Sequence, residues 1–351
     1  MVVRVVVAAS AAFVVLLLMG GLTLVLYLNS GRPTRRPGNP GPNRPDPFSG
    51  KHTQAADMAA ELRRLVDPVA IPLPQFPPLE TPRESLLGDA VVYDVDLRTA
   101  NPSTSAPASG MRLRISLPAG EHPAASLGCV LLPPPGGSAI SGHELYDEGA
   151  LTHVAAYLQA GYAVVEFSLD GALSTEQEVT MAQVQAAFNA VRESRAGLCN
   201  CRAALEFVLA RLPAVNPARL FISGHSSAGG VALLFAAFEP RLKGCIALAP
   251  VTDWTDDVPG ELLVQMPGLR EFSYAESAGL QRERPKCPVF IYHGTADENV
   301  ASVGTEVYVL SVRALGQSVT FERGIGGDHF EAVNTEGVPR AIAWLKSLPG
   351  E

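Results

Sequence analysis

The sequence has little charge, few cysteines and no excess of basic residues, and each shortage excludes a class of protein. Charged residues make up 18% of the chain and hydrophobic residues 47%, which excludes an intrinsically disordered chain. Acidic residues outnumber basic ones by 35 to 27, so the formal net charge is −8 and no basic field is present to attract a nucleic acid. The five cysteines form no CxxC pair, which excludes a zinc ribbon and a dense disulfide framework.

The longest uncharged run lies near the N-terminus. Residues 5–28 contain no charged side chain. A helix of this length spans about 36 Å, enough to cross a hydrocarbon core of about 30 Å. A cleaved secretory signal is the alternative, but its apolar core has about 7–15 residues and ends at a small-x-small cleavage site. Residues 27–32 offer no good site of that kind. We therefore predict a membrane anchor over residues 1–30 that crosses the bilayer once.

The charges on either side of this run bear on its orientation. Arg4 precedes the run, whereas Arg32, Arg35, Arg36 and Arg44 follow it. Because positive residues favour the cytoplasmic side, this flank would place the rest of the chain in the cytoplasm. The opposite topology, with the globular part outside, stays open at this point, and so does the oligomeric state.

The chain beyond the anchor divides by composition. Residues 31–50 are dense in proline, glycine and arginine, which is typical of an extended tether. A short helical pattern over residues 53–66 and a proline cluster at 68–82 follow. We assign residues 31–87 to this tether with its helical segment. Residues 88–351 form the predicted catalytic domain.

Hydrophobic periodicity in that domain predicts a mixed α/β fold. Residues 93–97 and 111–117 alternate apolar and polar side chains, which indicates half-buried antiparallel strands near a sheet edge. Later strands are nearly continuous apolar runs, typical of a parallel sheet covered on both faces. These runs are 129–133, 162–169, 219–224, 245–250 and 288–294.

Helical patterns alternate with these strands. They cover residues 143–160, 183–211, 228–238, 305–315 and 337–348. Strand and helix in turn predict βαβ units, hence a mostly parallel central sheet with helices on both faces. Residues 253–286 are longer than a crossover needs, and we expect them to form a small cap over the sheet.

A serine follows the strand at 219–224 directly. The chain turns from Gly224 into an apolar helix, and a serine on such a tight turn is the nucleophile-elbow arrangement. Small residues are needed two positions before and two after the nucleophile, because strand and helix backbones crowd there. Gly224 and Ala228 meet this requirement around Ser226, whereas Ser227 would have the bulky His225 in the first of these places. Ser226 is therefore the predicted nucleophile, although Ala228 departs from the G-x-S-x-G pattern by one methyl group.

A serine hydroxyl needs a base to take its proton, and that base needs an orienting carboxylate. Asp297 follows the strand at 288–294, and His329 lies in a glycine-rich loop after the next strand. This chain order of serine, acid and histidine is the one expected for this arrangement. Asp253 is the best alternative acid, although we expect it to cap a helix of the cap region.

Other titratable groups near these motifs have structural explanations. We expect Asp170 to fix a loop and Asp328 to brace its own loop. His225 is held beside the nucleophile and cannot reach over it as a base. We expect a structural hydrogen bond at His293.

Acyl transfer also needs an oxyanion hole. The backbone N–H of Ser227, the residue after the nucleophile, is one predicted donor. The other comes from the loop after the strand at 129–133, which reads PPGGSA from Pro134. Proline has no N–H, so Gly137 or its neighbour is the predicted donor. The pattern implies no metal and no organic cofactor.

Three motifs together resemble the catalytic domain of α/β-hydrolases. They are GHSSAGG at 224–230, YHGTADENV at 292–300 and GGDHF at 326–330. The resemblance is strongest to the prolyl-oligopeptidase and dienelactone-hydrolase-like branches and covers about residues 88–350. It implies an α/β-hydrolase fold with Ser226, Asp297 and His329 as the triad. The loop after 129–133 lacks the histidine of the common HGG pattern, which leaves the second oxyanion donor open.

These observations lead to one main hypothesis and one alternative. The main hypothesis is a membrane-anchored serine hydrolase that cleaves an ester or a peptide bond, which the sequence does not separate. The alternative is a catalytically inactive hydrolase-fold protein that binds a partner at the membrane. All three triad positions carry competent residues in the expected order, which favours the enzyme.

Overall fold

A computed structural model of the chain describes residues 59–351, except residues 86, 103, 147–150, 175–177, 256–257 and 259. The predicted membrane-spanning segment over residues 5–28 lies outside the described residues. Within the described part of the chain, no helix combines the length and the apolar character needed to cross a bilayer.

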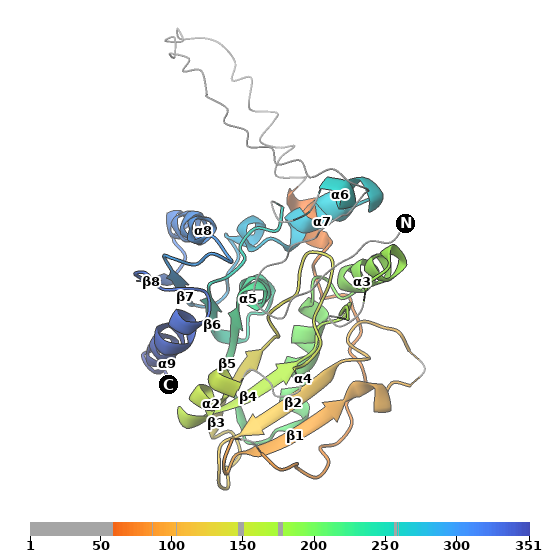
Figure 1. The fold of residues 1–351 in the computed structure, drawn as a ribbon. Coiled ribbons are helices and arrows are strands. Elements are labelled where there is room, and N and C mark those ends of the chain that lie inside the picture. The colour runs from red at the N-terminus through yellow and green to blue at the C-terminus, as the bar shows by residue number, and fades with distance from the viewer. Residues whose placement is uncertain are drawn as a thin grey trace.

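One eight-stranded sheet forms the centre of the molecule (Figure 1), in the order β1-β2-β4-β3-β5-β6-β7-β8. Strand β2 is antiparallel to both of its neighbours, β1 and β4, and every other adjacent pair is parallel. This confirms the predicted parallel sheet with antiparallel strands at one edge. The strands are β1 (Val91–Asp96), β2 (Arg112–Leu117), β3 (Leu127–Leu132), β4 (Tyr162–Phe167), β5 (Val215–His225), β6 (Leu242–Leu248), β7 (Val289–Gly294) and β8 (Val319–Gly324).

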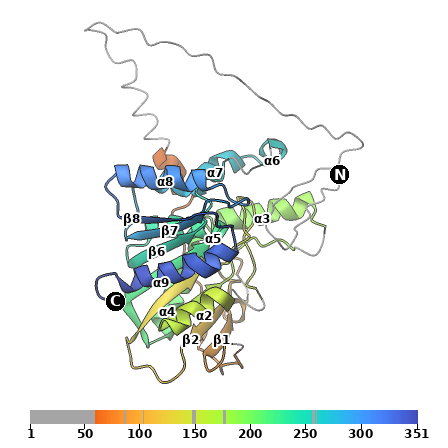
Figure 2. The same cartoon turned by 60° about the vertical axis from the view of Figure 1, so that its left-hand side comes forward.

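Helices cover both faces of this sheet, as the apolar strands predict. Two helices pack side by side over one face (Figure 2), namely α2 (Leu151–Gln159) and α9 (Val338–Lys346). The other face is covered by α3 (Met181–Glu193), α4 (Leu198–Arg211), α5 (Ser227–Phe238) and α8 (Ser302–Ala314). Side chains of the fully buried β3 alternate between the two cores, with Cys129 facing one and Val130 the other.

The predicted helix over 183–211 is two helices. Helix α3 ends at Glu193 and α4 begins at Leu198. Between them Arg195, Ala196 and Gly197 have φ angles of 58°, 57° and 79°. Three left-handed residues in succession cannot continue a right-handed helix. Arg195 and Ala196 are good helix formers, so their composition conceals the break.

The predicted helix over 143–160 is shorter at its start. Residues 143–146 are not helical, and the described helix α2 begins at Leu151. The carbonyl of His143 accepts from the Leu169 N–H at 2.8 Å, and that of Tyr146 accepts from the Arg114 guanidinium at 2.8 Å. These carbonyls therefore accept hydrogen bonds from neighbouring elements and not from a helical turn.

Described residues before β1 lie against the domain. Residues 59–64 are helical, and Leu62 and Phe76 pack against the main core. Arg202 of α4 donates to the carbonyls of Pro68, Val69 and Ile71 at 2.9–3.3 Å. The predicted domain boundaries stay predictions, but hydrogen bonds join this proline-rich stretch to α4.

The described part of the segment between β6 and β7 contains two short α-helices and a 3-10 turn. These are α6 (Gly260–Gln265), α7 (Leu269–Glu276) and η2 (Ala278–Gln281). Two short elements lie elsewhere in the chain: η1 (Leu97–Thr99) after β1, and a π-helical turn, η3 (Val333–Gly337), before α9. Figure 1 shows α6 and α7 close to α3 at one end of the molecule, where Phe272 packs edge-on against Phe188.

Candidate active site

Ser226 lies on a strained turn between β5 and α5. Its φ and ψ angles are 59° and −127°, a backbone conformation that only a tight turn imposes on a non-glycine residue. A Cβ added to Gly224 would lie 2.0 Å from the Ala228 carbonyl oxygen, so a side chain at 224 has no room. Ala228 is fully buried and its methyl group fits. The crowding expected on both sides of the turn is therefore present.

The neighbouring Ser227 is used differently. Its Oγ accepts a hydrogen bond from the Gly136 N–H at 2.8 Å. This bond ties the loop after β3 to the first turn of α5. Because the Ser227 hydroxyl holds the loop, the geometry favours Ser226 over Ser227 as the nucleophile.

Asp297 and His329 meet beyond the ends of β7 and β8. His329 Nδ1 lies 2.6 Å from Asp297 Oδ2. The other carboxylate oxygen, Oδ1, accepts from the backbone N–H groups of Asn299 and Val300 at 2.9 Å each. The Asp297 side chain is fully shielded from solvent and that of His329 is 4% exposed. Both carboxylate oxygens are thereby fixed in position.

The environment of Asp297 keeps its carboxyl ionised. Burial raises the pKa of this carboxyl, but hydrogen bonds from His293 and His329 and from the Val300 N–H outweigh burial and hold the pKa well below its ordinary value. His293 Nε2 lies 3.3 Å from Asp297 Oδ2 and also bonds the Val300 carbonyl at 2.9 Å. The sequence analysis predicted a structural hydrogen bond at His293, but it did not predict the contact between His293 and the Asp297 carboxylate.

His225 connects the serine turn to the histidine loop. Its Nε2 donates to the His329 carbonyl at 2.8 Å, and the two rings lie 4.5 Å apart between centroids. Burial, together with the nearby His329 and His153, lowers the pKa of His225 to about 3, so this ring is neutral. In the described part of the chain no hydrogen bond joins the Ser226 hydroxyl to His329. Such bonds are often long in free enzymes and tighten around a substrate.

The two predicted oxyanion donors lie on adjacent segments. Ser227 opens α5, where the first N–H groups have no partner within the helix. Gly137 lies in the loop that Gly136 ties to Ser227, and both Gly137 and Ser227 line one pocket. A second bond within this loop, from the Ser138 N–H to the Ser141 carbonyl at 2.8 Å, closes a tight turn. The loop is therefore held against the start of α5.

The other predicted acids have structural partners. Asp253 accepts from the Thr255 N–H and hydroxyl at 2.9 and 2.6 Å, so it closes a local turn and caps no described helix, unlike the prediction. Asp328 accepts from the backbone N–H groups of Phe330 and Ala332 at 3.0 and 3.1 Å. Asp170 accepts from the Ala108 N–H at 2.7 Å. The last two brace loops, as expected.

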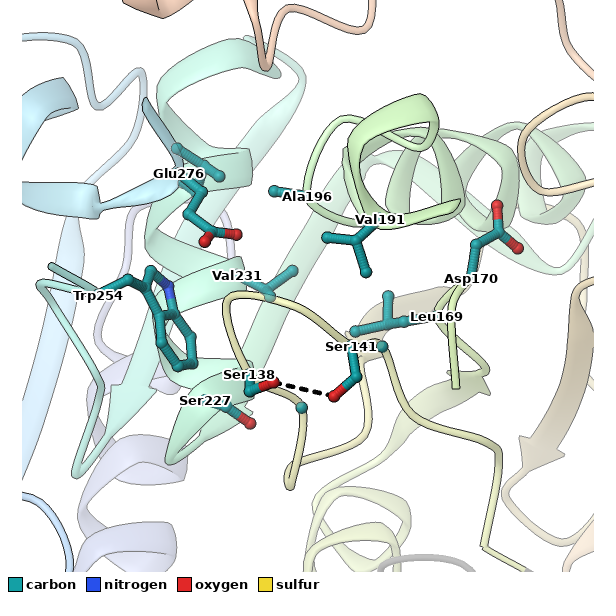
Figure 3. Close-up of a pocket in the computed structure, with 14 residues that line it drawn as sticks. Ser138, Ser141, Leu169, Asp170, Val191, Ala196, Ser227, Val231, Trp254 and Glu276 are labelled. Atoms are coloured by element: carbon teal, nitrogen blue, oxygen red, sulfur yellow. Dashed lines mark hydrogen bonds between the residues drawn. The ribbon is translucent and has the colours of Figure 1, made fainter. Parts of the chain in front are cut away.

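A small pocket with a cavity volume of about 30 Å³ lies at the start of α5 (Figure 3). Gly137 and Ser227 line it on the side of the predicted oxyanion donors, and Val231 of α5 forms part of its wall. Trp254 and Glu276 contribute from the cap region. Sequence reasoning missed both residues: an acidic residue such as Glu276 is usually exposed, and the place of Trp254 depends on how the cap segment packs on the sheet.

Comparison with protein families matches residues 150–347, more than half of the chain, to the prolyl oligopeptidase family. Among curated proteins, a probable trichothecene esterase, SAT6 of Stachybotrys chartarum, is 34% identical over 91 residues. That match covers 26% of this chain and 19% of the esterase, so the chain spans about a fifth of that relative.

Solved structures share the fold. The dipeptidyl peptidase 4 of Porphyromonas gingivalis superposes with a TM-score of 0.54 at 18% identity, over 68% of this chain and 34% of the peptidase. An acetyl xylan esterase from Paenibacillus sp. R4 superposes with a TM-score of 0.55 at 15% identity, over 87% of this chain and 96% of the esterase. At these identities the likeness shows the α/β-hydrolase fold.

Proposed function

The chain belongs to the prolyl oligopeptidase family of serine hydrolases, and we propose that it is a membrane-anchored member that cleaves an ester or peptide bond through an acyl-enzyme. Three observations support this proposal: the family match, the strained serine turn, and the buried pair of acid and histidine. The anchor is supported by the uncharged run at residues 5–28.

The proposed reaction has two steps. The Ser226 Oγ attacks the substrate carbonyl carbon while His329 Nε2 takes the hydroxyl proton, and His329 then gives that proton to the departing alcohol or amine. The product of this step is an ester between Ser226 and the acyl group. His329 then takes a proton from water, whose oxygen attacks this ester, and the acid is released as His329 gives the proton to the Ser226 Oγ. Asp297 holds the imidazole by its Nδ1 atom and stabilises the imidazolium form.

The tetrahedral intermediate in each step carries an anionic oxygen. We assign its stabilisation to the N–H groups of Ser227 and Gly137. The bond from the Gly136 N–H to the Ser227 hydroxyl keeps the two segments together, so the donors are positioned before substrate binds.

The observation that carries this proposal most directly is the 2.6 Å contact between His329 and Asp297. Structural histidines are common, but this one is buried and is held through Nδ1 by an ionised carboxylate. Its backbone carbonyl also accepts from Nε2 of His225, the residue before the serine. The contact through Nδ1 leaves Nε2 of His329 as the ring nitrogen for proton transfer.

Hydrolysis assays on the full chain test the proposal. We expect turnover of short acyl esters of 4-nitrophenol, with kcat lower by about 10⁴-fold or more in Ser226→Ala. A peptide library measured in parallel separates ester from peptide cleavage. A folded wild-type protein that cleaves neither class of substrate would contradict the proposal.

A further inference from the structure

The proposed reaction does not use the carboxyl group of Glu276. This residue ends helix α7 and is 4% exposed. It lines the same pocket as Ser227 and Gly137. Figure 3 shows its carboxyl group directed from the helix toward the space between Trp254 and Val231. An acid at this place therefore shares a pocket with the predicted oxyanion donors.

Glu276 lacks the partners that buried acids usually have. Its Oε1 atom is buried, and no described residue donates a hydrogen bond to it. Burial raises the pKa of Glu276 well above its ordinary value. Asp170 in the same pocket differs, because its carboxylate already accepts from the Ala108 N–H at 2.7 Å. A buried and unsatisfied carboxyl costs stability, so a ligand that supplied a donor would remove that cost.

The scaffold holds Glu276 in place. The next residue, Ser277, donates through its hydroxyl to the Ser273 carbonyl at 2.6 Å and accepts from the Trp254 N–H at 2.8 Å. One turn earlier, Phe272 packs on Phe188 of α3 with ring centroids 5.8 Å apart. The pocket wall that carries the carboxyl is therefore joined to α3 and to the loop after β6.

The residue types that line the pocket favour a cationic ligand. Its described lining contains two carboxyl groups and an indole ring but no lysine, arginine or histidine. Glu276 also stands at the carbonyl end of α7, where the helix dipole attracts positive charge. The face of an indole such as Trp254 attracts cations as well. A volume of about 30 Å³ admits only a small group.

We infer that Glu276 binds a primary ammonium group that the substrate carries close to its scissile carbonyl. On this view the enzyme selects aminoacyl esters, or peptides with a small N-terminal residue, over acyl groups of equal size without the amine. The inference rests on the proposed function, since it names the substrate class of the same site.

Two esters of equal size test this inference. The substrates are 1-naphthyl glycinate and 1-naphthyl propionate, which have the same leaving group and differ by an ammonium in place of a methyl group. Each kcat/KM is divided by the uncatalysed rate, because the ammonium also activates the ester. We expect the full-length wild type to favour the glycinate at least tenfold, mainly through KM, as a charged hydrogen bond would provide.

The variants are Glu276→Gln, which removes the charge at nearly constant shape, and Glu271→Gln on the exposed side of the same helix. The preference should fall about tenfold or more in E276Q and stay at the wild-type value in E271Q. Thermal unfolding of E276Q, expected at or above the wild-type midpoint, shows that the loss does not come from misfolding.

Two outcomes would overturn the inference, and they are distinguishable. A wild-type preference that persists in E276Q, or that is absent from the start while propionate is hydrolysed, removes the role of Glu276 but leaves the hydrolase intact. If neither ester is hydrolysed and a fluorophosphonate leaves the protein unlabelled, the proposed function itself fails and the role of Glu276 falls with it.

Discussion

At the scale of single residues, the site depends on where each polar atom finds its partner. Asp297 uses both oxygens, His329 uses Nδ1, and Ser227 uses its hydroxyl to hold a loop. We propose that Ser226 and Glu276 provide the groups that contact the substrate. The sequence predicted the first four residues because each stands at the end of a strand in a recognisable motif. It did not predict Glu276, because burial of a helix-end acid depends on packing between distant segments.

The first prediction distinguishes the two candidate acids. Asp297→Asn should lower kcat by about 10³–10⁴-fold with the fold retained, because the amide cannot stabilise the imidazolium form of His329. Asp253→Asn is the matched control and should change kcat little, since Asp253 accepts hydrogen bonds from Thr255 and Ser277 and not from His329. Steady-state kinetics on one ester measures both. A large loss in Asp253→Asn with little change in Asp297→Asn would reverse the assignment.

The second prediction concerns acid stability. The pKa of His225 falls from 6.5 to about 3 on folding, because burial disfavours the charged ring and His329 and His153 lie close by, while Asp297 acts in the opposite sense. The unfolded chain therefore binds the proton first, so this contribution to stability is complete above pH 6.5 and is lost as the pH falls toward 3.

Urea unfolding at several pH values measures this effect. The wild type should lose at most about 1.4 kcal/mol per pH unit through His225. His225→Gln should lose correspondingly less. Parallel curves for the two proteins between pH 6.5 and 4.5 would show that His225 does not titrate in this way.

At the scale of elements, the apolar runs predicted the strands and their order of appearance well, because a strand covered on both faces has little compositional freedom. The break between α3 and α4 was missed, since Arg195 and Ala196 favour helices and a single Gly197 is a weak signal. This break matters for the site, because Ala196 and Gly197 line the pocket. The cap was expected as a segment, but its side chains could not be placed, since their contacts with α3 are not local.

The third prediction tests the crowding between β5 and α5. Gly224→Ala should destabilise the protein by about 3 kcal/mol and impair activity, because the added methyl group meets the Ala228 carbonyl oxygen at 2.0 Å. Gly260→Ala at the start of α6 has no atom within 4 Å of its added methyl group and is the matched control. Denaturant unfolding of both variants checks this. Equal stabilities would mean that the turn relaxes around a side chain.

At the scale of the whole molecule, the sheet brings distant residues to one edge. Strands β5 to β8 are parallel and in register, with His225 opposite Leu248 and Gly294 opposite Gly324. Their carboxyl ends therefore lie together, where open α/β sheets bind ligands. Three motifs spread over residues 224–330 thus converge without any long loop. That convergence follows from the parallel direction of these strands, which the sequence predicted, whereas the order of the strands in the sheet came from the structure.

The fourth prediction concerns the N-terminal run. The full chain should sediment with membranes and resist extraction by high salt and carbonate, because the proposed anchor would bury its uncharged run at residues 5–28 in lipid. A variant that lacks residues 1–50 should stay in the supernatant. Release of the full chain by salt alone would contradict the anchor and favour a surface contact.

The fifth prediction tests the central claim, an activated serine at position 226. The full chain is labelled with a fluorophosphonate probe in wild type, Ser226→Ala and Ser227→Ala. We predict strong labelling of the wild type, complete loss in Ser226→Ala and slower but retained labelling in Ser227→Ala, since the Ser227 hydroxyl holds the loop of the second predicted oxyanion donor and does not attack the probe. Labelling that persists in Ser226→Ala and disappears in Ser227→Ala, or a folded wild type that takes up no probe, would contradict the account.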